Sequence, residues 1–141
     1  RANAASLAAN LDALSAELQA LLAPVKDRGF VTAHDAFRYF AHAFGLRYLG
    51  AFALDPELPV GAASQRALRA KALAGEVACL AVEPQFEPAA IRELARETGL
   101  PVVVMDPLGY GLTPGPELYP ALLRRNAEAL ATCLAQAKSS G

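Results

Sequence analysis

The sequence predicts an α/β domain with a four-stranded, mainly parallel sheet and helices on both faces. Short apolar runs alternate along the chain with longer segments in which apolar residues recur every three or four positions. Glycine or proline stands between most of these segments, as expected where helices end and turns begin. The alternation of strands and helices is typical of parallel sheets, because parallel neighbours are joined by a crossover that is usually a helix.

The first expected element is an amphipathic helix of about six turns that ends at Pro24. Its leucines recur at alternating spacings of four and three, which places them on one side of a helix. They are Leu7, Leu11, Leu14, Leu18, Leu21 and Leu22. Proline has no N–H to donate within a helix, so the helix should stop there. Residues 26–29 then form the turn into the first strand.

The remaining elements alternate between strand and helix. Expected strands are 30–34, 46–52, 77–82 and 102–105, and expected helices are 35–44, 64–74, 88–98 and 117–138. Ser64 is a candidate N-cap, and Gly99 stands where a helix should end. Residues 55–61 and 107–116 carry several prolines and glycines and are expected to be loops.

Length and composition indicate one globular domain over residues 1–141. Hydrophobic residues make up 54% and charged residues 19%, which suits a packed core and argues against disorder. The formal net charge is −1 with interspersed signs, so no basic stripe indicates a nucleic-acid partner. No apolar run approaches the roughly 18 residues of a membrane span. The chain opens without Met or a signal peptide, inside a helical pattern, so we expect an internal piece or a processed product.

Polar side chains stand where three of the expected strands end. His34 closes the first strand, Glu83 follows 77–82 and Asp106 follows 102–105. Ligands bind at the carboxyl edge of a parallel sheet, where such strand ends meet. We therefore expect His34 and Asp106 on one edge, with Glu83 nearby.

These three residues can also be read as structural. A histidine at a strand end is often an N-cap or a satisfied core group, and carboxylates before proline suit turns. Their corresponding positions favour a ligand set, but Zn²⁺ usually takes four ligands. His42 lies eight positions after His34, roughly 80° round a helix, so the pair cannot share an ion, and we expect His42 on the helix surface. The set therefore suits half of a metal site.

The sequence lacks the motifs of several other chemistries. It has no GxxxxGK[ST] phosphate loop, no GxGxxG after a strand, no CxxC pair and no serine in an elbow motif. Catalysis would have to rest on His34 and Asp106 without a nucleophile, so we do not expect an enzyme.

The two cysteines leave two interpretations open. Cys79 lies in an expected strand, and Cys133 shares the apolar stripe of the last helix. They are either two buried, unrelated thiols or a disulfide that closes a long loop, worth about 4 kcal/mol in the chain-entropy model. A structural disulfide would require an oxidising compartment.

Several stretches give the chain a resemblance to a known family. They are FVTAHDAFRYF at 30–40, FGL-x-x-LG-x-F at 44–52, AVEPQF at 81–86, MDPLG at 105–109 and Ala-Thr-Cys-Leu in the last helix. Together they cover nearly the whole chain in order. The chain resembles the C-terminal lobe of the ZnuA-like zinc-binding proteins of bacterial ABC importers, a branch of the metal-binding receptors.

In that family, two α/β lobes joined by a long helix bind one metal ion in the cleft between them. The resemblance implies that His34 is a Zn²⁺ ligand. It implies that Asp106 is a cleft-facing carboxylate, a direct ligand in manganese-type relatives and often replaced by water in zinc-type ones. EPQF and DPLG resemble the zinc branch, and that branch's disulfide corresponds to Cys79 and Cys133. Glu83 is expected to hold the strand end and its loop by hydrogen bonds.

The resemblance also implies partners and a location. A receptor of this kind is periplasmic and delivers Zn²⁺ to an ABC permease in the membrane, and its N-terminal lobe supplies further metal histidines. That lobe and the linking helix are not in this sequence, so we expect a fragment rather than a natural single-lobe protein. Two alternatives stay open: a manganese-type receptor lobe, and a stand-alone α/β interaction domain without metal binding.

Overall fold

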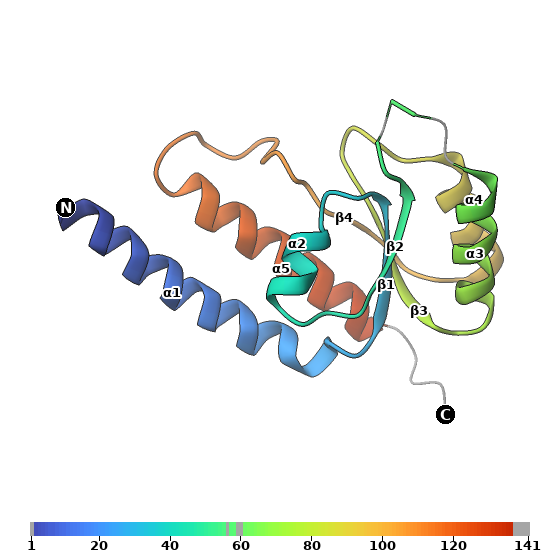
Figure 1. The fold of residues 1–141 in the computed structure, drawn as a ribbon, viewed down its shortest axis with the longest axis horizontal. Coiled ribbons are helices and arrows are strands. Elements are labelled where there is room, and N and C mark those ends of the chain that lie inside the picture. The colour runs from blue at the N-terminus through green and yellow to red at the C-terminus, as the bar shows by residue number, and fades with distance from the viewer. Residues whose placement is uncertain (1, 56, 59–60, 137–141) are drawn as a thin grey trace.

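A parallel sheet forms the centre of the molecule (Figure 1). The computed structural model describes residues 2–55, 57–58 and 61–136. Within these residues the sheet has four strands in the order β2-β1-β3-β4, and all three neighbouring pairs are parallel. The strands are β1 (Gly29–His34), β2 (Tyr48–Ala53), β3 (Val77–Val82) and β4 (Val102–Val104). The predicted fold class is therefore confirmed.

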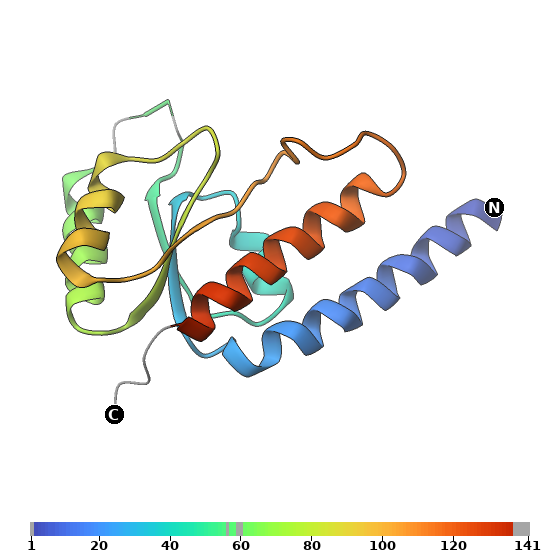
Figure 2. The same ribbon diagram turned by 180° about the vertical axis from the view of Figure 1, so that it is seen from behind.

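Helices cover both faces of this sheet, as Figures 1 and 2 show from opposite sides. They are α1 (Ala2–Leu22), α2 (Arg38–Ala43), α3 (Ala62–Leu73), α4 (Ala89–Thr98) and α5 (Leu118–Gln136), with a 3₁₀ helix at Ala23–Val25. The helices α1, α2 and α5 lie on one face, and α3 and α4 lie on the other. In the described part of the chain, no helix combines the length and the apolar character that crossing a membrane requires.

The sheet separates two apolar clusters. Neighbouring residues of a strand point to opposite faces, so Phe30 packs toward α1 and α5 while Val31 packs toward α3 and α4. The leucine stripe of α1 contributes only in part. Leu14, Leu18 and Leu22 are buried, but Leu7 is 56% exposed because the first half of α1 extends beyond the sheet (Figure 1).

Two expected helix starts are wrong. Helix α2 begins at Arg38 rather than at Asp35, because the Asp35 N–H donates to the Ala53 carbonyl (3.1 Å) and continues the pairing of β1 with β2. Helix α3 has Gly61 as its N-cap, so Ser64 lies within the helix. The extended Gly61 accepts the Gln65 N–H through its carbonyl (3.1 Å), and glycine is an acceptable N-cap residue.

The other element boundaries agree closely with the expected ones. Strand β3 has the predicted range, and α4 ends before Gly99, whose φ of 70° favours glycine. Residues 137–138 of the expected last helix, and residues 56 and 59–60 of the expected loop 55–61, lie outside the described residues.

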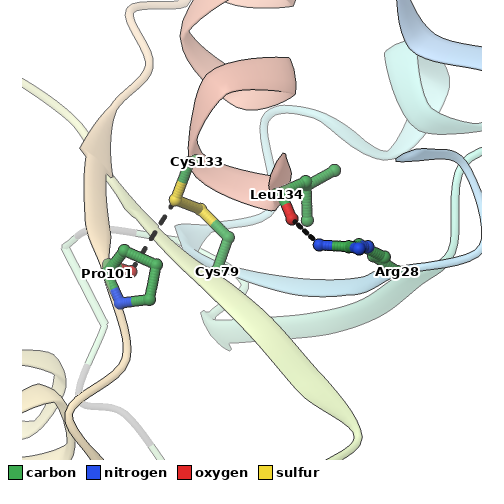
Figure 3. Close-up of a disulfide and its surroundings, with 5 residues drawn as sticks. All are labelled: Arg28, Cys79, Pro101, Cys133 and Leu134. Carbon is green, nitrogen blue, oxygen red and sulfur yellow. Dashed lines mark hydrogen bonds between the residues drawn. A yellow bond between two sulfur atoms is a disulfide. The ribbon is translucent and has the colours of Figure 1, made fainter. Parts of the chain in front are cut away.

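A disulfide joins α5 to the sheet (Figure 3). It links Cys79 of β3 to Cys133, with 5.8 Å between the Cα atoms, and both residues are buried. The pairing implied by the family resemblance is thus confirmed. Beside it, the Arg28 guanidinium donates to the Leu134 carbonyl (2.7 Å), so the end of α5 is held covalently and by a hydrogen bond.

Candidate metal site

The backbone at the end of β1 fixes the position of His34. His34 pairs with Ala53 of β2, and its carbonyl accepts a hydrogen bond from the Thr32 hydroxyl (2.7 Å). The next residue, Asp35, donates its N–H to Ala53. The histidine therefore stands at the carboxyl end of an interior strand, on a backbone held by hydrogen bonds.

The imidazole of His34 is oriented by Glu83. Nδ1 of His34 lies 3.0 Å from Oε1 of Glu83, and the imidazole side chain is 24% exposed. An ionised carboxylate only accepts hydrogen bonds, so Nδ1 carries the hydrogen and the neutral ring keeps its lone pair on Nε2. Within the described part of the chain no hydrogen bond reaches Nε2. The lone pair of this nitrogen could therefore bind a metal ion.

Glu83 is itself fixed at the end of β3. Its backbone exchanges two hydrogen bonds with Phe86 (3.1 and 3.2 Å), which close a tight loop. Its side chain is only 9% exposed, and this burial raises the pKa of the Glu83 carboxyl. The nearby His34 opposes the pKa shift, whereas the Asp106 carboxylate adds to it. Asp106 therefore lies near enough for its charge to act on the His34–Glu83 pair.

Asp106 is more deeply buried, at 3% exposure. Its Oδ1 accepts the N–H of Leu108 (2.9 Å), and its Oδ2 accepts the N–H of Tyr110. Its backbone is bound twice by Asn126 of α5, because the Asp106 N–H donates to Oδ1 and the Asp106 carbonyl accepts from Nδ2, both at 2.8 Å. Asp106 thus organises the loop between β4 and α5.

The parallel sheet places His34, Glu83 and Asp106 at the same edge, because His34 ends β1 and the other two lie just beyond the carboxyl ends of β3 and β4. Only His34 and Glu83 are joined by a side-chain hydrogen bond. Over the described ranges, no group of three or more His, Cys, Asp or Glu side chains is arranged to hold a metal ion. His42 is exposed in the last turn of α2, as its spacing predicts.

Sequence reasoning missed two features of this edge. The first is Asn126, whose signal is a polar residue on the buried stripe of α5. The second is a polar network behind His34, in which the Tyr48 hydroxyl donates to Asp35 Oδ1 (2.9 Å) and lies 3.0 Å from the Thr32 hydroxyl. Arg38 completes it by donating to Asp35 Oδ2 (2.9 Å from Nε). Burial is the largest cause that raises the pKa of Tyr48, and the hydrogen bond to Asp35 adds to it.

Known proteins are similar to this chain in sequence. Residues 1–133 match the family described as zinc-uptake complex component A, periplasmic (ZnuA). The high-affinity zinc uptake system protein ZnuA of Brucella suis is 40% identical over 134 residues, which cover 95% of this chain and 40% of that protein. Its namesake from Haemophilus ducreyi is 38% identical over 134 residues, covering 95% of this chain and 43% of the relative.

Solved structures share the fold. A crystal structure of ZnuA superposes with a TM-score of 0.76 at 26% identity, covering 94% of this chain and 49% of that one. The laminin-binding protein Lbp of Streptococcus pyogenes has a TM-score of 0.74 at 28% identity, covering 87% of this chain and 48% of its own. The chain thus spans less than half the length of these relatives. By its sequence match over residues 1–133, it belongs to the ZnuA family of periplasmic zinc-uptake components.

Proposed function

We propose that this chain is the C-terminal lobe of a periplasmic receptor that binds Zn²⁺ and delivers it to an ABC importer. One observation carries the proposal: His34 stands at the carboxyl edge with Nδ1 on Glu83 and with Nε2 left for a ligand. Histidines that bind metals commonly donate their other nitrogen's hydrogen to a carboxylate, which sets the tautomer and the ring orientation. Membership of a zinc-uptake family supports Zn²⁺ as the ion.

The lobe contributes part of a site. Zn²⁺ usually takes four ligands from nitrogen, sulfur and oxygen atoms, and His34 supplies one strong nitrogen. The remaining ligands come from the N-terminal lobe of the same protein. This fits the comparisons, in which the chain spans less than half the length of its relatives. In the isolated chain, water fills the other positions and binding is weak.

Asp106 supplies negative charge beside the ion. Each of its carboxylate oxygens accepts one loop amide, and each keeps a further lone pair. It acts on the bound ion directly or through a water molecule. An imidazole in the ligand set favours zinc over manganese, because imidazole suits zinc whereas manganese prefers carboxylate, carbonyl and water oxygens.

This function requires no chemical transformation. A receptor binds and releases its cargo, and the side chains at this edge offer coordination and charge. The Cys79–Cys133 disulfide fits an oxidising compartment such as the periplasm. The partners are the second lobe and the membrane permease that accepts the ion.

Competition against a chelator of known zinc affinity tests the proposal. The wild-type chain should bind Zn²⁺ weakly, and His34→Ala should abolish that binding. His34→Asn is the sharper variant, because its amide can still donate to Glu83 but has no counterpart of Nε2. His42→Ala is the matched control and should leave the affinity unchanged. Tight one-to-one binding that survives His34→Ala would contradict the proposed site.

A further inference from the structure

The side chain of Asn126 forms two hydrogen bonds with the backbone of Asp106, as a neighbouring strand would do. Asn126 lies in α5 and is 4% exposed. Its side-chain amide accepts a hydrogen bond from the Asp106 N–H and donates one to the Asp106 carbonyl, both at 2.8 Å. Asp106 is buried just beyond the end of β4. Buried backbone groups without partners are costly. Asn126 therefore removes that cost and fixes where the Asp106 backbone stands.

With its backbone fixed, Asp106 holds its carboxylate toward the loop that follows. Oδ1 and Oδ2 bind the amides of Leu108 and Tyr110. The neighbouring Arg125 of α5 donates to the Tyr110 carbonyl (3.0 Å), so consecutive residues of one helix hold both ends of this short segment. The position of the carboxylate is thereby set by the hydrogen bonds of the Asp106 backbone and by those of both carboxylate oxygens.

Helix α5 is a firm support for this arrangement. About two turns beyond Asn126, Cys133 ties the same helix to β3 through the disulfide. The disulfide thus anchors the helix covalently to the sheet (Figure 3), and Asn126 anchors it to Asp106 just beyond β4.

We propose that Asn126 is a positioning residue of the metal site, which sets the place of the Asp106 carboxylate relative to His34. This inference deepens the proposed function and rests on it. Asp106 follows directly after the point where β4 pairs with β3, because the Met105 N–H donates to the Val82 carbonyl (2.8 Å). The residue after Val82 is Glu83, the partner of His34. Because electrostatic interactions depend on distance, a displaced Asp106 changes how strongly the edge attracts a cation.

A double-mutant cycle tests the inference. Zn²⁺ affinity is measured by chelator competition for the wild-type chain, Asn126→Ala, Asp106→Ala and the double variant. Asn126→Ala should lower the affinity about 10-fold, as is typical for partners that orient a ligand. It should have no further effect once Asp106 is Ala, because Asn126 acts through that residue. Asn126→Asp, which keeps the acceptor but loses the donor, gives a second variant if the alanine variant does not fold.

Hydrogen exchange supplies a readout specific to positioning. Asn126→Ala should speed exchange at the Leu108 and Tyr110 amides, which depend on the Asp106 carboxylate. Leu130→Ala is the control, since Leu130 is buried on the same helix within the core cluster. It should destabilise the chain while it leaves zinc affinity unchanged.

Two outcomes would overturn this inference without touching the proposed function. The first is that Asn126→Ala and Asp106→Ala have additive effects on Zn²⁺ affinity. The second is wild-type affinity in either Asn126 variant while His34→Ala abolishes binding. Wild-type affinity in His34→Ala overturns the proposed function itself.

Discussion

His34 ends β1 and Asp106 follows β4 at the same edge of the sheet, but the structure holds the two side chains differently. The backbone of His34 belongs to the sheet, and its ring is fixed through one nitrogen by Glu83. Asp106 lies beyond its strand, and both its backbone and its carboxylate are held, by Asn126 and by two loop amides. Its exposed fraction is 3%, whereas that of the His34 side chain is 24%.

Because of this difference we propose different roles for two residues that look equivalent in the sequence pattern. A ring held at Nδ1 alone can offer Nε2 to an incoming ion without losing a contact. A carboxylate whose oxygens already bind amides contributes charge and shapes its loop. Substitutions at His34 should therefore act mainly on metal binding, and substitutions around Asp106 should act on stability as well.

The largest expected effect concerns the anchor of the helix behind Asp106. The double substitution Cys79→Ala, Cys133→Ala removes a bridge with a sequence separation of 54 residues. In the chain-entropy model this should lower the free energy of unfolding by about 4 kcal/mol, measured by urea denaturation. Hydrogen exchange should increase in α5 and at residues 106–110 more than around His34.

Intact mass after alkylation under denaturing, non-reducing conditions is the control for that experiment. Wild-type protein recovered from an oxidising compartment should take up no alkylating reagent. An increase in exchange confined to β1 would mean that α5 does not support the Asp106 side of the edge.

The next effect compares the two strand ends directly. Asp106→Ala should cost about 2–3 kcal/mol of unfolding free energy, because the Leu108 and Tyr110 amides lose a charged acceptor. His34→Asn should cost less than about 1 kcal/mol, because its amide can still donate to Glu83. Thermal unfolding of both variants measures this, and a larger loss in His34→Asn would reverse the comparison.

The sequence predicted which residues lie at the carboxyl edge of the sheet, but not the contacts that hold them there. Apolar runs bounded by glycine and proline marked the strands, and the rule for parallel strand ends brought His34 and Glu83 together. Asn126 could not be assigned, because a polar residue in an apolar stripe does not reveal a partner twenty positions away. The late start of α2 depends on the pairing of Asp35 with Ala53, which is a tertiary contact. The spacing of the cysteines left their pairing open, and metal binding by His34 and Asp106 stays a prediction.

A smaller effect is expected on Zn²⁺ affinity when the hydrogen bond between His34 and Glu83 is removed. Glu83→Ala should lower Zn²⁺ affinity about 10-fold or more, because the ring loses the acceptor that sets its tautomer. Glu83→Gln should lower it less, because the amide oxygen can still accept from Nδ1. The control is Glu87→Gln, an exposed residue paired only loosely with Arg92 at 3.6 Å. Equal affinities for wild type and Glu83→Ala would show that His34 needs no orienting partner.

The smallest effect concerns the network behind His34 and depends on pH. Burial and Asp35 raise the pKa of Tyr48, so the folded state keeps the phenol proton to higher pH than the unfolded chain does. Above about pH 10 the unfolded chain loses that proton first, and the free energy of unfolding should fall as pH rises. Tyr48→Phe should cost about 1 kcal/mol at neutral pH through its lost hydrogen bonds, but should show a shallower alkaline decline. Urea midpoints from about pH 8 to about pH 11 measure both the cost of the substitution and the alkaline decline.

Tyr39→Phe, at a tyrosine that is 87% exposed, is the control and should keep the wild-type slope. Parallel declines in wild type and Tyr48→Phe would show that this hydroxyl does not link the fold around His34 to pH.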